Sequence, residues 1–258
     1  MSAPLLDIRG LRKSFGGLDV VRGLDLQVGA GERVALIGPN GAGKTTVFNL
    51  INGYYAPDTG EIRLAGLDLV PIAPRRRIRH GLARSFQNIR LIGHLTVLEN
   101  VLLGAHVHAG GPLAMLLPMA LGRGRALREE ARARLAEAGL SNHAGSLAAG
   151  LAYGLRKRVE VVRALMARPR LLLLDEPCAG LNTQERSALL AELHRVAEGG
   201  VTLLVVEHDM HFVGGLCQRA AVLNFGEKIA EGTPAEIARE PAVIEAYLGH
   251  APERYAHA

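Results

Sequence analysis

The segment GPNGAGKTT, residues 38–46, has the residue types and the spacing of a loop that binds phosphate groups. It matches the pattern G-x-x-x-x-G-K-[ST], and it stands between an apolar run, RVALI, and a run of helical character, TTVFNLING. Glycines allow consecutive backbone N–H groups to curl around phosphate oxygens, and the N-terminus of the following helix adds partial positive charge. We therefore predict that this phosphate loop binds a nucleotide through Gly38, Pro39, Asn40, Gly41, Ala42, Gly43, Lys44, Thr45 and Thr46.

Two residues of the phosphate loop have specific expected tasks. The ammonium group of Lys44 would neutralise the β- and γ-phosphates, and the hydroxyl of Thr45 would bind Mg²⁺. Lys44 is thus a predicted catalytic residue as well as a nucleotide ligand. The cofactors predicted by the sequence are ATP and Mg²⁺.

Acidic residues end a second apolar run, RLLLLDEP, residues 170–177. In a phosphate-loop ATPase, Asp175 would hold Mg²⁺ through water, and Glu176 would orient or deprotonate the attacking water. The alternative is that the two acids only cap a strand in solvent, although buried charge is costly without a partner. His208 ends the neighbouring run VVEHD and could reach the γ-phosphate or Glu176. We predict catalytic roles for Glu176 and His208, and a metal-ligand role for Asp175.

The elements that position these residues are strands and helices of an α/β fold. Short strand-like runs open the chain in LLDIRGL, LDLQVGAGE, VALIGPNG and GEIRLAGLDL, whereas RLLLLDEP and VTLLVVEHD are continuous apolar runs typical of buried parallel strands. The region from residue 95 to 165 has mostly helical character, and the tail TPAEIAREPAVIEAYLGH has helical turns interrupted at Pro234 and Pro241. We predict a phosphate-loop NTPase core, a mostly parallel sheet flanked by helices, with an antiparallel β subdomain and an inserted α-helical subdomain.

The amino-acid composition of the chain indicates the class of protein to which it belongs. The chain has 258 residues, 48% apolar content and a net charge of +5, which is compatible with one domain and is too small an excess to indicate nucleic-acid binding. Cys178 and Cys217 lack metal-ligand neighbours, and we expect both to be small apolar fillers in a reducing compartment. The N-terminus has no pattern of a secretory signal, and PLAMLLPMAL is too short to span a bilayer. We therefore expect a cytoplasmic protein.

A further segment, LAYGLRKR, residues 151–158, has a Tyr-Gly pair at the start of a basic helical run. With it, the chain resembles the nucleotide-binding subunits of ATP-binding cassette (ABC) transporters over nearly its whole length. In that family a signature motif, usually LSGGQ, faces the ATP of an opposite subunit. The resemblance implies nucleotide contacts from Ala152, Tyr153 and Gly154, although alanine replaces the usual serine and Leu155 the usual glutamine. An ordinary helix start with a basic face is the alternative.

Other parts of the family pattern imply further site residues. Phe15 in KSFGG matches the aromatic residue that stacks on adenine, although a lone phenylalanine also suits a core. Gln87 in RSFQN matches the glutamine that reaches Mg²⁺ and the attacking water, so it is a predicted catalytic residue and metal ligand. AGLN, residues 179–182, matches a loop that crosses the subunit interface, with Asn182 in place of the usual aspartate.

Several segments resemble the ATPase subunits of branched-chain amino acid importers. They are FGGLDVV, GPNGAGKTTVFNLINGYY, RSFQNIRL, LTVLENV, LAYG, DEPCAGLN, EHDM and AYLG, and residues 106–125 match extra length in that subfamily. The resemblance implies one ATPase domain over residues 5–250, a helical subdomain near residues 90–165 and a tail at 251–258. It also implies a peripheral position on the cytoplasmic face of the inner membrane.

The resemblance further implies partners. These are transmembrane permease subunits, a second ATPase subunit that is a copy or a paralogue, and, indirectly, a solute-binding protein. The rival functions are urea or amide uptake, lipopolysaccharide export, and a soluble ATPase acting on DNA or ribosomes. PRRRIRHG, residues 74–81, is a basic run, but it lacks the interleaved aromatic residues of single-strand binders. We expect no nucleic-acid partner.

Overall fold

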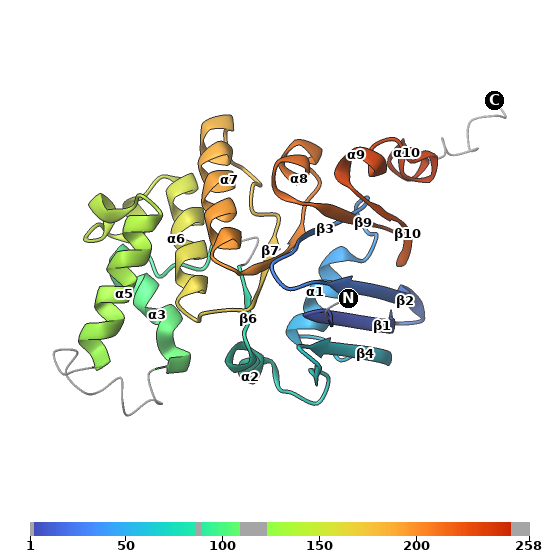
Figure 1. Ribbon diagram of the computed structural model, residues 1–258, viewed down its shortest axis with the longest axis horizontal. Helices are drawn as coiled ribbons and strands as arrows, with labels where there is room; N and C mark the ends of the chain where they lie inside the picture. The colour runs from blue at the N-terminus through green and yellow to red at the C-terminus, as the bar shows by residue number, and fades with distance from the viewer. Residues whose placement is uncertain (1–2, 86–88, 109–122, 249–258) are drawn as a thin grey trace. The chain divides into compact units, whose positions relative to one another are not determined.

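The computed structural model describes residues 3–85, 89–108 and 123–248, and the chain divides into two compact units (Figure 1). Unit 1 comprises residues 1–72 and 203–258, and unit 2 comprises residues 73–202. The strands that the first part of the sequence forms belong to unit 1. Within the described ranges, none of the helices combines the length and the apolar character that crossing a membrane requires.

Unit 1 contains an antiparallel sheet with the strand order β2-β1-β4-β5. Its strands are β1 (Leu6–Phe15), β2 (Leu18–Val28), β4 (Thr59–Leu64) and β5 (Leu67–Asp68). Alternate residues of the paired strands point into the core, because successive side chains of a strand face opposite sides of the sheet. The buried set includes Leu6, Ile8, Leu24, Leu26, Val28, Ile62 and Leu64. This sheet is the antiparallel β subdomain predicted from the sequence.

The second sheet of unit 1 carries the phosphate loop. Strand β3 (Arg33–Ile37) lies between β8 (Thr202–Val206) and β9 (Arg219–Asn224) and runs parallel to both, and β10 (Glu227–Gly232) pairs with β9 in the antiparallel sense. The last four residues of β3 are fully buried, as expected of a parallel strand covered on both faces. Helix α1 (Lys44–Asn52) follows and ends at Gly53, which has φ of 81°.

The described part of unit 1 contains three further helices. They are α8 (Met210–Leu216), α9 (Pro234–Ile237) and α10 (Pro241–Leu248). The two prolines that interrupt the helical pattern of the tail are the first residues of α9 and α10. Proline suits the first helical position because the N–H that it lacks has no partner within a helix there.

Unit 2 combines a parallel strand pair with a helical core (Figure 1). Strand β6 (Leu82–Arg84) pairs with β7 (Leu171–Asp175), whose five residues are all buried. The helices are α2 (Pro74–Arg77), α3 (Val97–Leu103), α5 (Arg123–Glu137), α6 (Tyr153–Leu165) and α7 (Thr183–Glu198), with short 3₁₀ segments at Ile78–His80, Gly104–His108, Ser141–His143 and Ala148–Gly150. The helical region predicted from residue 95 to 165 is thus confirmed for its described part.

Helix α6 packs closely against the end of α3 at one glycine. A Cβ atom added to Gly104 would lie 1.9 Å from the backbone oxygen of Arg163 and 3.0 Å from Cβ of Met166. A side chain cannot occupy that space unless the two helices separate. The closeness of α3 and α6 therefore depends on glycine at this position.

The substitution Gly104→Ala is expected to lower the free energy of unfolding by about 2 kcal/mol, since the added methyl group overpacks a helix contact. The corresponding fall in Tm is about 4–8 °C for a chain of this length. Thermal denaturation followed by circular dichroism measures it. Gly145→Ala is the matched control, because nothing lies within 4 Å of a Cβ added there. Equal Tm values for the two variants would contradict the prediction.

Candidate functional site

The phosphate loop runs from the end of β3 into the first turn of α1, and two of its glycines are required by their surroundings. Gly38 has φ of 146°, and a Cβ atom there would lie 2.1 Å from the backbone oxygen of Leu223. Gly43 has φ of 101°, and its Cβ would lie 2.6 Å from the backbone oxygen of Val20. Both φ values are strained for residues with a side chain. The loop is therefore held against β9 and β2 in a shape that only glycine allows.

Lys44 is the first residue of α1 and is buried. Its Nζ donates hydrogen bonds to the backbone oxygens of Gly38 and Pro39, at 2.7 and 2.8 Å. The ammonium group is thus folded back over the loop, and no acidic residue stands in the first turn of α1 to offset it. A charged amine and the N-terminus of a helix together favour an anion at this place.

The other phosphate-loop residues differ in how far they are exposed to solvent. Ala42 is buried, and its backbone oxygen accepts a hydrogen bond of 3.0 Å from the N–H of Gly226, in the turn between β9 and β10. Pro39 and Thr46 are half-buried. The exposed residues, whose backbone or side-chain groups are open to a ligand, are Asn40, Gly41 and Thr45.

Phe15 lies at the end of β1 and belongs to an exposed aromatic cluster. Phe15 is 39% exposed, and its ring meets the ring of Tyr55 edge to face, with centroids 5.0 Å apart. Tyr54 in turn meets Tyr55 at 5.3 Å, and the ammonium of Lys13 lies 5.2 Å from the centre of the Phe15 ring. This arrangement does not fit the alternative that Phe15 is a core residue. The sequence reasoning did not assign Tyr54 and Tyr55 to this cluster.

His208 follows β8 and has a largely exposed side chain, at 62%. Its neighbours have structural tasks: the fully buried Glu207 accepts a hydrogen bond of 3.0 Å from the backbone N–H of His208, and Asp209 caps α8 by accepting from the N–H groups of His211 and Phe212. The imidazole Nδ1 lies 3.7 Å from Oε2 of Glu207. The turn therefore presents the imidazole to solvent and fixes its backbone.

In unit 2, Asp175 is the last residue of β7 and is 5% exposed. Its Oδ2 lies 2.6 Å from Nη2 of Arg84, the last residue of β6. Glu176 comes next and has φ of 44°, an unfavourable conformation for a residue with a side chain. Such strain is found where a site requires a particular side-chain direction. Sequence reasoning missed Arg84, since the pair joins residues 91 positions apart.

The start of α6 contains the predicted signature residues. Ala152 is the N-cap and provides no side-chain hydrogen bond, and Tyr153 is 38% exposed. A Cβ atom added to Gly154 would lie 2.5 Å from the carboxylate of Glu185, and one added to Gly180 would lie 3.2 Å from the ring of Tyr153. The start of α6 and the loop that leads into α7 thus pack closely at these two glycines, and a side chain at Gly154 would displace the Glu185 carboxylate.

Asn182 has a local role that explains its residue type. Its side chain accepts a hydrogen bond of 2.9 Å from the N–H of Glu185, and the Glu185 carboxylate accepts one of 3.1 Å from the N–H of Asn182. This reciprocal pair is a capping box at the start of α7. Asparagine fulfils this role as well as aspartate does.

Gln87 lies outside the described residues, as do positions 109–122 of the segment 106–125. The chain is described again from residue 89, and α6 holds Arg90 by its backbone. Glu160 accepts a hydrogen bond of 3.0 Å from the Arg90 N–H, and Arg163 donates one of 2.6 Å to the Arg90 oxygen. Burial raises the pKa of Glu160.

The donor types present suit Mg²⁺. This ion prefers hard oxygen ligands and is usually held through one or two carboxylates together with substrate phosphates. Thr45 offers an exposed hydroxyl and Asp175 a carboxylate at a strand end. Within the described ranges, no three His, Cys, Asp or Glu side chains are grouped as metal ligands.

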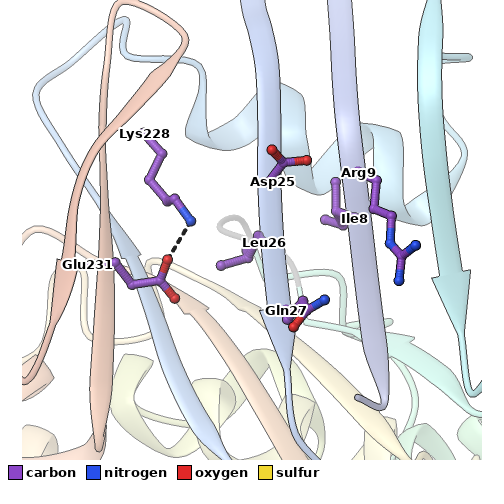
Figure 2. Close-up of a pocket in the computed structure, with 7 residues that line it drawn as sticks. All are labelled: Ile8, Arg9, Asp25, Leu26, Gln27, Lys228 and Glu231. Atoms are coloured by element: carbon purple, nitrogen blue, oxygen red, sulfur yellow. Dashed lines mark hydrogen bonds and ion pairs between the residues drawn. The ribbon is translucent and has the colours of Figure 1, made fainter. Parts of the chain in front are cut away.

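Two cavities lie away from the predicted site residues. One, of about 360 Å³, lies in unit 1 beside the ion pair of Lys228 and Glu231 (Figure 2), and its other lining residues are Ile8, Arg9, Asp25, Leu26 and Gln27. The second, of about 510 Å³, lies in unit 2, and α5, α6 and α7 each contribute to its lining. Its lining includes Glu192, whose Oε2 accepts a hydrogen bond of 2.7 Å from Nε of Arg158.

Burial raises the pKa of Glu192 from 4.5 to about 7, against the opposing effect of Arg158. The folded protein therefore binds this proton more tightly than the unfolded chain does. Stability from this group is present below pH 4.5 and is lost as the pH rises to about 7.

Between pH 4.5 and 7, wild type is expected to lose up to about 3 kcal/mol of unfolding free energy relative to Glu192→Gln, because the amide does not titrate. Urea unfolding of both proteins at a series of pH values measures this difference. Glu137→Gln, at the same cavity but exposed, is the control and should follow wild type. A constant difference between wild type and Glu192→Gln across that range would contradict the prediction.

Comparisons with known proteins agree with this geometry. A family model described as "ABC transporter" matches residues 21–179, and one described as "Branched-chain amino acid ATP-binding cassette transporter" matches residues 227–253. The chain is 44% identical to the high-affinity branched-chain amino acid transport ATP-binding protein BraF of Pseudomonas aeruginosa, over 97% of this chain and all of the relative. It is 42% identical to LivG of Escherichia coli, a protein of the same description, with the same coverage.

Solved structures give the same result. The ADP conformation of MJ1267, an ATP-binding cassette of an ABC transporter, is similar with a TM-score of 0.86 and 29% identity, over 96% of this chain and all of the other. The dimeric structure of MJ0796, a bacterial ABC transporter cassette, is similar with a TM-score of 0.74 and 26% identity, over 89% of this chain and 98% of the other.

Proposed function

Because the chain belongs to the ABC transporter family of ATP-binding cassettes, we propose that it is the ATP-hydrolysing, energy-coupling subunit of an importer for branched-chain amino acids. The observation that carries the substrate class is the 44% identity to BraF, which extends over the full length of that relative. The match of residues 227–253 to a branched-chain amino acid cassette model supports it from a separate part of the chain.

Different residues of the chain carry out different parts of ATP hydrolysis. The phosphate loop binds the β- and γ-phosphates through backbone N–H groups, and Lys44 adds a positive charge. Glu176 accepts the proton of the attacking water, and His208 and Gln87 contact the γ-phosphate and the water. Thr45, Asp175 and Gln87 would hold Mg²⁺, which would supply positive charge to neutralise the phosphates. Phe15 stacks on the adenine ring, because an aromatic face covers a flat base well.

A second cassette completes the proposed assembly, as a copy of this chain or a paralogue. Its ATP meets the signature residues Ala152, Tyr153 and Gly154 of this chain, and the two subunits close head to tail around two nucleotides. The dimeric cassette MJ0796 supports this arrangement. Permease subunits receive the motion, a solute-binding protein delivers the amino acid to them, and the chain is peripheral on the cytoplasmic face of the membrane. Residues 5–250 form the ATPase domain and 90–165 its helical subdomain.

Uptake of radiolabelled leucine tests this function. Source cells carry the wild-type protein, Lys44→Ala, or the matched control Lys228→Ala, which removes only a surface ion pair. Leucine uptake should fall with Lys44→Ala alone, at equal protein levels, while urea uptake stays unchanged. Loss of urea uptake instead would favour an amide importer. Unchanged uptake of both solutes, with ATPase activity intact in the purified wild type, would favour an exporter.

A further inference from the structure

The buried contact between Arg84 and Asp175 joins a predicted Mg²⁺ ligand to a positive charge that the chain itself provides. Nη2 of Arg84 and Oδ2 of Asp175 are 2.6 Å apart, and their side chains are only 8% and 6% exposed. Both residues belong to unit 2. The contact is therefore an internal feature of that unit.

The backbone fixes the positions of both partners. Strands β6 and β7 are parallel neighbours, and Arg84 pairs with Leu173, two residues before Asp175. The backbone N–H of Ser85 continues the pairing with a hydrogen bond of 2.9 Å to the oxygen of Leu173. Both side chains thus project from the same end of a two-strand ladder. A shift of either strand would separate them.

The geometry of the contact leaves one carboxylate oxygen outside it. Arg84 reaches Oδ2, and Oδ1 is not part of this ion pair. A carboxylate taken out of water is strongly destabilised unless a cation or hydrogen-bond donors accompany it. Charge-assisted hydrogen bonds are also the more directional and stronger ones. Arg84 can therefore stabilise Asp175 and fix its direction at the same time.

We propose that Arg84 is a positioning residue that acts as a built-in counter-ion: it holds Asp175 by Oδ2 and leaves Oδ1 for Mg²⁺. This inference rests on the proposed function, in which Asp175 is a magnesium ligand. It has a consequence that a purely structural ion pair lacks. When Arg84 is absent, Mg²⁺ with nucleotide can supply the positive charge that Asp175 has lost, so its binding should stabilise the variant more than it stabilises wild type.

Thermal unfolding of Arg84→Gln tests the proposal, first in EDTA and then with Mg²⁺ and the non-hydrolysable analogue AMP-PNP. In EDTA, Tm should fall by about 5–15 °C, as for other buried pairs that lose one partner. Adding Mg²⁺ and AMP-PNP should raise Tm at least twice as far as in wild type. Arg84→Lys, which keeps the charge, should lie between the two proteins in both conditions.

The matched control is Arg158→Gln, which breaks another ion pair of unit 2, with Nε of Arg158 2.7 Å from Oε2 of Glu192. It should lose stability in EDTA and show the same rise with Mg²⁺ and AMP-PNP as wild type. The double variant Arg84→Gln/Asp175→Asn should regain most of the Tm lost by Arg84→Gln in EDTA, because no buried charge is left without a partner.

The outcomes separate the two proposals. A wild type whose Tm does not respond to Mg²⁺ and AMP-PNP would overturn the proposed function and this inference together. A wild type that responds, with Arg84→Gln responding no more than Arg158→Gln does, would overturn the counter-ion role alone. Additive losses in the double variant would also overturn it.

Discussion

The variant Glu176→Gln is expected to hydrolyse ATP at least about 100-fold more slowly than wild type, since general-base catalysis typically contributes 10²–10⁴-fold. The amide has the shape of the carboxylate but cannot accept a proton from the attacking water. The strained backbone of Glu176, with φ of 44°, is the same for both residues, so the direction of the side chain should be kept. ATP affinity should therefore remain within about threefold of wild type.

Steady-state phosphate release and ATP titration measure these two quantities on the same preparation. Glu198→Gln is the control, because this exposed glutamate lies at the far end of α7. It should behave as wild type in both assays. Turnover by Glu176→Gln at the wild-type rate would show that another residue acts as the base.

Replacement of Lys44 by alanine is expected to have a different pattern, with loss of ATP binding as well as turnover. Nζ of Lys44 lies over the phosphate loop, bonded to the oxygens of Gly38 and Pro39. Alanine removes the charge that would meet the phosphates, and removal of one such stabilising group typically costs 10²–10³-fold in rate. We expect kcat/KM to fall by about that factor and ATP affinity to fall at least about tenfold.

A fluorescent ATP analogue, titrated against wild type, Lys44→Ala and Lys44→Met, measures the affinity. The methionine variant keeps much of the side-chain volume, so it separates loss of charge from loss of packing. It should bind as weakly as Lys44→Ala. Full affinity in Lys44→Met would mean that the charge of Lys44 does not contact the nucleotide.

Features encoded in short continuous segments could be predicted from the sequence. The glycine spacing of residues 38–46 and the flanking apolar run predicted β3, the loop and α1, because close backbone approach and helix initiation are local requirements. The run LLLLD predicted β7, whose residues are all buried. A continuous apolar run that is this short and is bounded by acidic residues fits a buried strand better than it fits other elements.

Features that depend on distant residues could not be predicted in this way. Strand β6 has only three residues and exists through its pairing with β7, and β9 and β10 were not predicted. The contact of Arg84 with Asp175 has no local signal. The exposed position of Phe15 beside Tyr54 and Tyr55 likewise depends on how β1 approaches the end of α1 within unit 1.

The role of Asn182 could be predicted from the sequence only in part. Its departure from the family pattern implies the loss of a shared charge at the subunit interface, and that effect stays a prediction. The local signal that was not used is the spacing of Asn182 and Glu185, which is typical of a capping box.

The fit between the start of α6 and the loop before α7 limits how this protein can change in sequence. A residue with a Cβ atom at position 154 is incompatible with the present placement of the Glu185 carboxylate, which also closes the capping box with Asn182. A larger residue at 154 would therefore displace the flexible Glu185 side chain and open the capping box at the start of α7. The residue at position 154 is thus coupled to the start of α7, and a substitution in one segment is expected to loosen the helix end formed by the other.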